Sequence, residues 1–266
     1  MRVVKTISKT FGVSAVKTSP WEPTELANRF AATAAARGFR TESFGEHAGC
    51  PLNAFTRRTP GRRPRIYLSS GVHGDEPAPP LALLELLELG VFDDRATWFL
   101  VPLLNPTGFR QKTRENESGV DLNRDYRHLT SPEVAAHVGW LRRQPPFDLC
   151  FCLHEDWEST GFYLYEVLSE GRLRLAPAII EAVRRIAPID PAQIIDGRPV
   201  AEPGIIHPDI DPAIRETWPE ALYLREHHTH CSYTLETPSA FPLKERVTTM
   251  ATAVTIGLTA FFKQTP

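Results

Sequence analysis

The stretch RIYLSSGVHGDE, residues 65–76, decides the fold, because it joins a buried strand to a loop that carries polar side chains. The apolar run at its start predicts a strand over residues 65–70. The loop that follows, residues 71–80, contains His73 and Glu76 and leads to LALLELLEL, in which apolar and acidic residues recur at helical spacing. The stretch therefore predicts a strand, a loop and a helix over residues 81–89 in succession.

The same alternation continues along the chain. Further strands are predicted over residues 97–104, 148–153 and 231–235, and further helices over residues 24–37, 131–143, 177–187 and 243–262. Strands that alternate with helices are typical of an α/β fold, with a mainly parallel sheet and helices on both faces. No repeat or linker divides the chain, so we expect a single domain over residues 1–266. Residues 188–225 are rich in Pro, Asp and Gly and predict a long irregular excursion that lines a site.

The composition excludes several classes of protein. The 30 basic and 32 acidic side chains nearly balance, which argues against a nucleic-acid partner. Four cysteines are too few for a disulfide scaffold in a chain of 266 residues, and we expect Cys150 and Cys152 to be small buried side chains. The apolar run 247–262 is shorter than the roughly 20 residues that cross a bilayer. No signal peptide is apparent at the N-terminus, so we expect a cytoplasmic protein without a membrane partner.

Polar residues that bind metals follow two of the predicted strands. His73 and Glu76 are three residues apart after the first, and His154 follows the strand over residues 148–153. Two histidines and one glutamate form a recurrent catalytic zinc set that leaves a coordination position open for water. Taken singly, each motif is at least as typical of a solvated turn as of a metal site.

Two further clusters contain residues suited to anionic substrates and to proton transfer. The segment 105–126 holds Arg114, Asn123 and Arg124, and an arginine fork recognises carboxylates. Glu236 ends the strand over residues 231–235, where a carboxylate either caps the next turn or acts as a general base.

In order, these clusters resemble the zinc carboxypeptidase family. The motifs are His-x-x-Glu, Asn-Pro-x-Gly-Phe, Lys-Thr-Arg, Gly-Val-Asp-Leu-Asn-Arg, a strand-terminal His and a late Glu, and they span residues 66–240. The resemblance implies a zinc carboxypeptidase-like fold with Zn²⁺ as cofactor. It implies these roles: zinc ligands His73, Glu76 and His154; general base Glu236; oxyanion stabiliser Arg114; carboxylate clamp Asn123 and Arg124; and Asp121 as the carboxylate that holds a ligand histidine by its other ring nitrogen.

The chain departs from the family pattern at several positions. The family often has Asn-Arg-Asn-Phe where this chain has Asn-Arg-Asp-Tyr, residues 123–126. Three acidic residues follow the third ligand, Glu155, Asp156 and Glu158, and they indicate either a substrate amine nearby or structural caps. The family's mobile tyrosine has no clear match, since neither Tyr223 nor Tyr233 stands in its place. We expect the histidines at positions 227, 228 and 230 to be solvated.

The function implied is that of a zinc-dependent metallocarboxypeptidase or peptide amidase, similar to bacterial murein peptide amidases that trim cell-wall peptides. The alternative is a zinc-dependent N-acyl amino acid deacylase, similar to the succinylglutamate desuccinylase and aspartoacylase group. The partner is accordingly a small peptide or an acylated amino acid. A non-catalytic binding protein is less favoured, because all the ligands and the base are present. The sequence does not indicate an oligomeric state.

Overall fold

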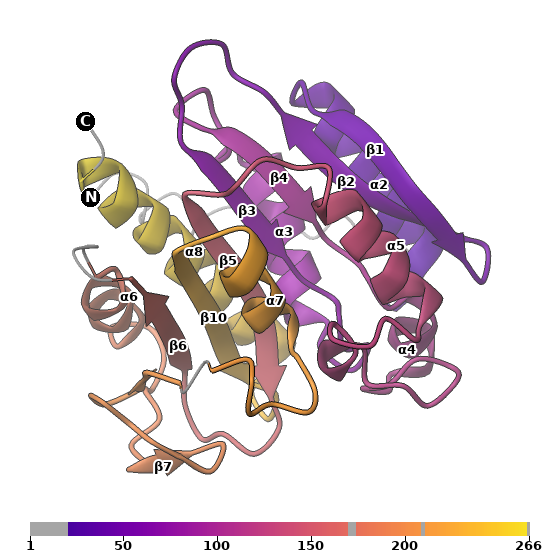
Figure 1. The fold of residues 1–266 in the computed structure, drawn as a ribbon. Helices are drawn as coiled ribbons and strands as arrows, with labels where there is room; N and C mark the ends of the chain where they lie inside the picture. The colour runs from indigo at the N-terminus through magenta and orange to yellow at the C-terminus, as the bar shows by residue number, and fades with distance from the viewer. Residues whose placement is uncertain (1–20, 170–173, 209–210, 265–266) are drawn as a thin grey trace.

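The computed structural model describes residues 21–169, 174–208 and 211–264. In these residues an eight-stranded sheet has the order β1-β2-β4-β3-β5-β10-β6-β9 (Figure 1). The central strands β4, β3, β5 and β10 run parallel, and β9 pairs parallel with β6. The pairs β1–β2, β2–β4 and β6–β10 are antiparallel. The expected α/β fold with a mainly parallel sheet is confirmed.

The elements have the following bounds. The strands are β1 (Arg40–His47), β2 (Cys50–Arg57), β3 (Arg65–Ser69), β4 (Thr97–Val101), β5 (Leu149–Asp156), β6 (Tyr163–Leu168), β7 (Ile194–Ile195), β8 (Arg198–Pro199), β9 (Ile205–Ile206) and β10 (Cys231–Pro238). The helices are α2 (Pro23–Ala36), α3 (Ala78–Glu88), α4 (Pro106–Gln111), α5 (Pro132–Leu141), α6 (Ala176–Val183), α7 (Glu220–His227) and α8 (Leu243–Gln264), with a 3₁₀ turn η1 (Leu122–Arg124).

Helices cover both faces of the sheet (Figure 1). Helices α2, α3, α6 and α8 pack on one face around the larger apolar cluster, and α5 and α7 pack on the other. Strand β4 contributes to the apolar clusters on both faces, because Trp98 and Leu100 belong to the first cluster and Phe99 and Val101 belong to the second. Successive side chains of a strand point to opposite faces, so a strand without polar positions is buried on both sides.

The sequence-based expectations missed several elements. No strand was predicted before residue 65, yet β1 and β2 form an antiparallel hairpin with Ala48 and Gly49 in the turn, both at positive φ. Strand β1 lies at the sheet edge and has no buried residue, so its sequence lacks a buried alternation. Helix α4, strand β6, helix α7 and the short strands β7, β8 and β9 were also missed, and α7 begins inside the region predicted to be irregular.

Several boundaries and one burial prediction were wrong. Helix α3 begins at Ala78 rather than residue 81, because Pro79 and Pro80 occupy its first turn, where prolines are tolerated. Strand β4 ends at Val101, before Pro102. His228 is buried against the Phe147 ring, whereas His227 and His230 are exposed as expected. All four cysteines are buried without a disulfide. The expectation about a signal peptide concerns residues 1–20, which lie outside the described residues.

The topology brings the motifs together at the carboxyl ends of the parallel strands. Strands β3, β5 and β10 are neighbours and parallel, so the residues after β3 and at the ends of β5 and β10 lie together. Ligands of open α/β sheets bind at such carboxyl ends. None of the helices within the described ranges is long and apolar enough to cross a membrane.

Candidate active site

The turn that carries the first two predicted ligands is held by close backbone packing. The Gly71 carbonyl accepts hydrogen bonds from the backbone N–H groups of Leu104 (3.0 Å) and Asn105 (2.8 Å). A Cβ at Gly74 would lie 1.9 Å from the carbonyl carbon of Gly108, at the start of α4, so only glycine fits there. The two glycines of His-Gly-Asp-Glu and Asn-Pro-Thr-Gly therefore let the two loops touch, which fixes the turn between His73 and Glu76.

Three buried side chains converge at the carboxyl ends of β3 and β5. The His73 Nδ1 lies 2.5 Å from Glu76 Oε1, and the His154 Nδ1 lies 3.1 Å from Glu76 Oε2. Each residue offers a ligand atom, and these atoms all lie within 4.8 Å of one another. The three residues are 2–3% exposed. The structure thus brings together the residues predicted to share one ion.

The chemistry of this donor set fits zinc. Two imidazole nitrogens and one carboxylate are a recurrent catalytic zinc set. The other ring nitrogen of His73, Nε2, lies 3.3 Å from Asp121 Oδ1, so one ligand histidine has the carboxylate partner that orients metal-binding imidazoles. Burial disfavours the His73 cation, yet the Glu76 carboxylate raises the pKa of His73 to about 9. The site therefore attracts positive charge. Within the described ranges no other cluster of this kind was found.

Arg114 lies beside this cluster and is held by the same aspartate. Its Nε donates to Asp121 Oδ2 at 2.9 Å, while Asp121 Oδ1 accepts from the Asn123 backbone N–H at 2.9 Å. Burial opposes ionisation of Asp121, but the hydrogen bond from His73 and the Arg114 charge keep the pKa of this carboxyl well below its usual range. The Arg114 carbonyl accepts from the Asn105 side chain at 3.2 Å, so the Asn-Pro-x-Gly-Phe motif also positions this arginine.

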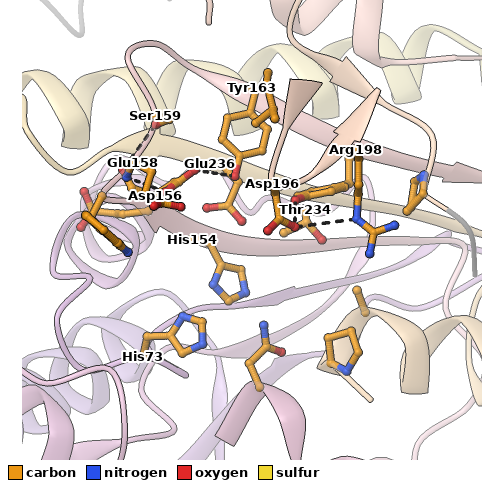
Figure 2. A pocket seen from close by; sticks show the side chains of 18 of the residues that line it. His73, His154, Asp156, Glu158, Ser159, Tyr163, Asp196, Arg198, Thr234 and Glu236 are labelled. Carbon is orange, nitrogen blue, oxygen red and sulfur yellow. Dashed lines mark hydrogen bonds and ion pairs between the residues drawn. The ribbon is translucent and has the colours of Figure 1, made fainter. Parts of the chain in front are cut away.

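Glu236 is placed by the register of two neighbouring strands. In the parallel pairing of β10 with β5, Glu236 is opposite His154. Their side chains point to the same face of the sheet, and Figure 2 shows the Glu236 carboxylate next to the His154 ring with Tyr163 beyond it. Burial, together with Glu76 and Asp156, raises the pKa of Glu236 well above its ordinary value. A cation bound at the histidines would oppose this shift and favour the carboxylate.

The two residues of the predicted clamp have different environments. Arg124 is exposed at the cleft, and its guanidinium donates to the Asn123 carbonyl at 3.0 Å. The Asn123 side chain is partly buried, and its Oδ1 accepts from the Glu220 backbone N–H at 2.9 Å. Both residues line the same cleft as the three predicted metal ligands, as does Arg114. The structure thus places every predicted site residue in one cavity, which has a volume of about 820 Å³.

The acidic residues that follow His154 are mainly structural caps. Glu155 is buried and accepts from the Ala78 backbone N–H at 2.9 Å and from Arg246 at 2.7 Å. Asp156 accepts from the Tyr163 hydroxyl at 2.9 Å and from the Glu158 backbone N–H at 2.8 Å (Figure 2). Of the two readings left open for these residues, the structure favours caps for Glu155 and Asp156. A substrate amine is not needed to explain them.

The region 188–225, which we expected to line a site, does contribute to the cleft, but it contains a hairpin that was not expected from the sequence. The hairpin β7–β8 turns at Asp196 and Gly197, both at positive φ, and carries Arg198 (Figure 2). The Tyr165 hydroxyl donates to Asp196 at 2.7 Å and ties this hairpin to β6. The Asp-Gly dipeptide after two isoleucines is the available sequence signal for the hairpin. Neither Tyr223 nor Tyr233 reaches the cleft, since both are buried in the core.

Comparisons with known proteins agree with this geometry. Residues 62–188 match the family model of the succinylglutamate desuccinylase/aspartoacylase catalytic domain. Carboxypeptidase SOL1 of Arabidopsis thaliana is 31% identical over 100 residues, and the match covers 30% of this chain and 20% of that protein. The chain therefore spans about a fifth of the length of this curated relative.

Solved structures show the same fold. A protein of Shewanella amazonensis, provisionally named a metallopeptidase, aligns with a TM-score of 0.79 and 24% identity, over 91% of this chain and 94% of that one. A metallo-carboxypeptidase of Burkholderia cenocepacia aligns with a TM-score of 0.67 and 19% identity, over 88% and 68% of the two chains. Carboxypeptidase A of Helicoverpa armigera aligns with a TM-score of 0.65 and 14% identity, over 99% and 80%.

Proposed function

We propose that this chain, which has the zinc carboxypeptidase-like fold and carries that family's motifs in order, is a zinc-dependent hydrolase that cleaves the amide bond next to a terminal carboxylate. The names of the matched family and of the carboxypeptidase relatives support a metallohydrolase. The observation that carries the proposal is the convergence of His73, Glu76 and His154, buried and within 4.8 Å of one another, with Glu236 opposite His154 in the sheet.

In this proposal His73, Glu76 and His154 hold the zinc, which when bound would polarise the scissile carbonyl and acidify a water molecule. Glu236 accepts the proton of that water and returns it to the leaving amine, because it is placed opposite His154 in the register of the sheet. Arg114 supplies positive charge where the carbonyl oxygen becomes negative. Its guanidinium is oriented by Asp121, so little reorganisation is needed.

Asn123 and Arg124 bind the terminal carboxylate and so place the scissile amide near Glu236 and Arg114. An arginine beside a side-chain amide offers several donors to one carboxylate, which fixes both its position and its orientation. The cleft volume of about 820 Å³ accommodates a small peptide.

A deacylase of N-acyl amino acids is the second candidate, and the match of residues 62–188 to the succinylglutamate desuccinylase/aspartoacylase model favours it. Both reactions hydrolyse an amide next to an amino acid carboxylate, so they need the same ligands, base and clamp. They differ in whether the acyl side of the amide is a peptide or a simple acid.

A substrate panel separates the two candidates. Zinc-loaded protein would be incubated with small peptides of varied C-termini, including D-residues and diaminopimelate, and with N-acyl amino acids. We expect release of a C-terminal residue from peptides, dependent on zinc and abolished by a chelator. Release of free acid from acyl amino acids without peptide turnover would replace the first candidate by the second. Turnover of neither class would overturn the proposed function.

A further inference from the structure

Beneath the proposed clamp lies a chain of buried polar side chains that the catalytic steps do not use. Glu220, at the start of α7, is 1% exposed, and both of its carboxylate oxygens accept hydrogen bonds. The Tyr67 hydroxyl donates to Oε1 at 2.6 Å and the Ser69 hydroxyl donates to Oε2 at 2.8 Å. Both donors belong to β3, the strand that leads into the turn of His73. Burying a carboxylate is costly, so a fully bonded one signals a definite structural task.

The hydrogen bonds run in one direction through His137. The Tyr67 hydroxyl has a single hydrogen, which goes to Glu220, so at 3.1 Å it accepts from the Nε2–H of His137. Burial lowers the pKa of His137 to about 3, which keeps this imidazole neutral. Its Nδ1 therefore carries no proton and accepts from the Tyr126 hydroxyl at 2.9 Å. His137, Tyr67 and Tyr126 are 2% exposed or less.

This series of hydrogen bonds leads back to the segment of the proposed clamp, residues 123–126. The backbone N–H of Glu220 donates to Asn123 Oδ1 at 2.9 Å, and Tyr126 lies three residues after Asn123. The Tyr126 backbone N–H also donates to the Trp218 carbonyl at 3.2 Å, which pairs the clamp segment with the residues before α7. Both ends of residues 123–126 are thus bound to Glu220, one directly and one through His137 and Tyr67.

The geometry assigns Glu220 as a positioning residue that fixes the side-chain amide of Asn123, with Oδ1 held by the protein and Nδ2 left to donate to the substrate carboxylate. A backbone N–H can only donate, so Oδ1 is the atom that faces it. Within residues 21–169, 174–208 and 211–264, no group accepts a hydrogen bond from Nδ2, and Asn123 lines the cleft. The inference rests on the proposed function, because it concerns the orientation of the clamp.

Tyr126→Phe tests this ring of hydrogen bonds, which joins Asn123, Glu220, Tyr67, His137 and Tyr126, at a residue that does not line the cleft. The substitution removes one hydroxyl and leaves Asn123, Arg124 and the ligands unchanged. Tyr233→Phe is the matched control, because the Tyr233 hydroxyl is also buried and also donates to a buried side chain, that of Glu166 at 3.1 Å, outside the ring. If Tyr126→Phe does not fold, Glu220→Gln, which keeps the backbone N–H but replaces an accepting oxygen by a donor, serves in its place.

The first readout is hydrogen exchange at the Glu220 backbone amide, measured by NMR without substrate. We expect exchange to be faster by about tenfold in Tyr126→Phe and unchanged in Tyr233→Phe, since a lost buried hydrogen bond loosens its neighbours locally. Equal exchange in wild type and Tyr126→Phe would overturn the inference whether or not the protein turns over any substrate.

The second readout is the KM for a peptide with a free C-terminal carboxylate. We expect Tyr126→Phe to raise this KM several-fold with little change in kcat, and to have no further effect in an Asn123→Ala background. Additive effects of the two substitutions would contradict a role that acts through Asn123. Peptide turnover with additive effects would leave the proposed function standing and remove only the positioning role.

Discussion

The two walls of the cleft differ in how they are built. The metal wall consists of residues at the ends of neighbouring parallel strands, and its three proposed ligands are 2–3% exposed and bonded to one another. The opposite wall, or substrate side, comes from connections between strands: the turn with Asn123 and Arg124, and the segment between β5 and β10. That segment includes Trp157 and Ile194, which are 74% and 67% exposed. The first wall is fixed by the sheet, whereas the second depends on turns such as Asp196–Gly197.

This difference indicates that the two walls have different functions, one in catalysis and the other in substrate selection. Groups that act on the scissile bond need fixed positions, and the sheet with its hydrogen-bonded carboxylates supplies them. Groups that select a substrate can sit on connections, where changes in length and side chain leave the core intact. Substitutions in the metal wall should therefore alter kcat or metal affinity, and those on the substrate side should mainly alter KM.

The largest effect is expected for Glu236→Gln. The amide keeps the shape of the side chain but cannot accept the water proton, so kcat should fall roughly 10²–10⁴-fold. Zinc content, measured by elemental analysis, should stay unchanged, because Glu236 is not a proposed ligand. Glu158→Gln, on the exposed rim, is the matched control. Unchanged turnover in Glu236→Gln would refute the assigned base.

The next effect concerns the carboxylate that joins His73 to Arg114. Asp121→Asn should weaken zinc binding by roughly 10–100-fold, because the neutral amide orients the imidazole less well. A competition titration with a chelator measures this affinity. Asp125→Asn offers a comparison on the same turn, since Asp125 bonds Thr130 and Ser131 instead of a proposed ligand. Equal losses in both variants would show that the turn as a whole, and not the bond to His73, supports the metal.

A smaller effect is expected on the substrate side. Arg124→Ala should raise KM roughly tenfold or more for a substrate with a free carboxylate, which is the scale of one charge-assisted hydrogen bond. The kcat should change less than the KM. Arg185→Ala, in the exposed turn after α6, controls for the loss of one positive charge. A selective loss of kcat would move Arg124 to the catalytic group and weaken the contrast between the walls.

A further prediction concerns the pH dependence of metal binding. Glu76 raises the pKa of His73 to about 9, so the metal-free protein carries a proton there that zinc must displace. The apparent zinc affinity should therefore rise with pH, by about tenfold per unit below pH 9 for one displaced proton. Zinc titrations at several pH values between 6 and 9 measure it. A flat profile would show that the imidazole is already neutral before the metal binds.

The motifs made the metal wall predictable from the sequence. Each proposed ligand follows or ends a strand with a strong apolar pattern, and parallel strands bring such ends together. The order of the motifs added Asp121, Arg114 and Glu236, and the structure places all of them in the same cleft. The register of Glu236 opposite His154 could not be read from the sequence, because it depends on pairing between strands 75 or more residues apart.

The substrate side could not be predicted to the same extent. Strand β6 and helix α7 depend on tertiary packing, and α7 has only a weak apolar pattern. The departure from the family pattern at Asp125 and Tyr126 gained a reason only in three dimensions. Asp125 accepts hydrogen bonds from the residues before α5, and the Tyr126 hydroxyl closes the ring through His137.

The central claim is that His73, Glu76 and His154 bind one zinc ion, and its most direct test is the metal content of the purified chain and of His154→Ala. The account predicts about one zinc per wild-type chain and a large loss in His154→Ala, with circular dichroism showing that the variant is folded. A folded His154→Ala variant that keeps the wild-type zinc content would contradict the account.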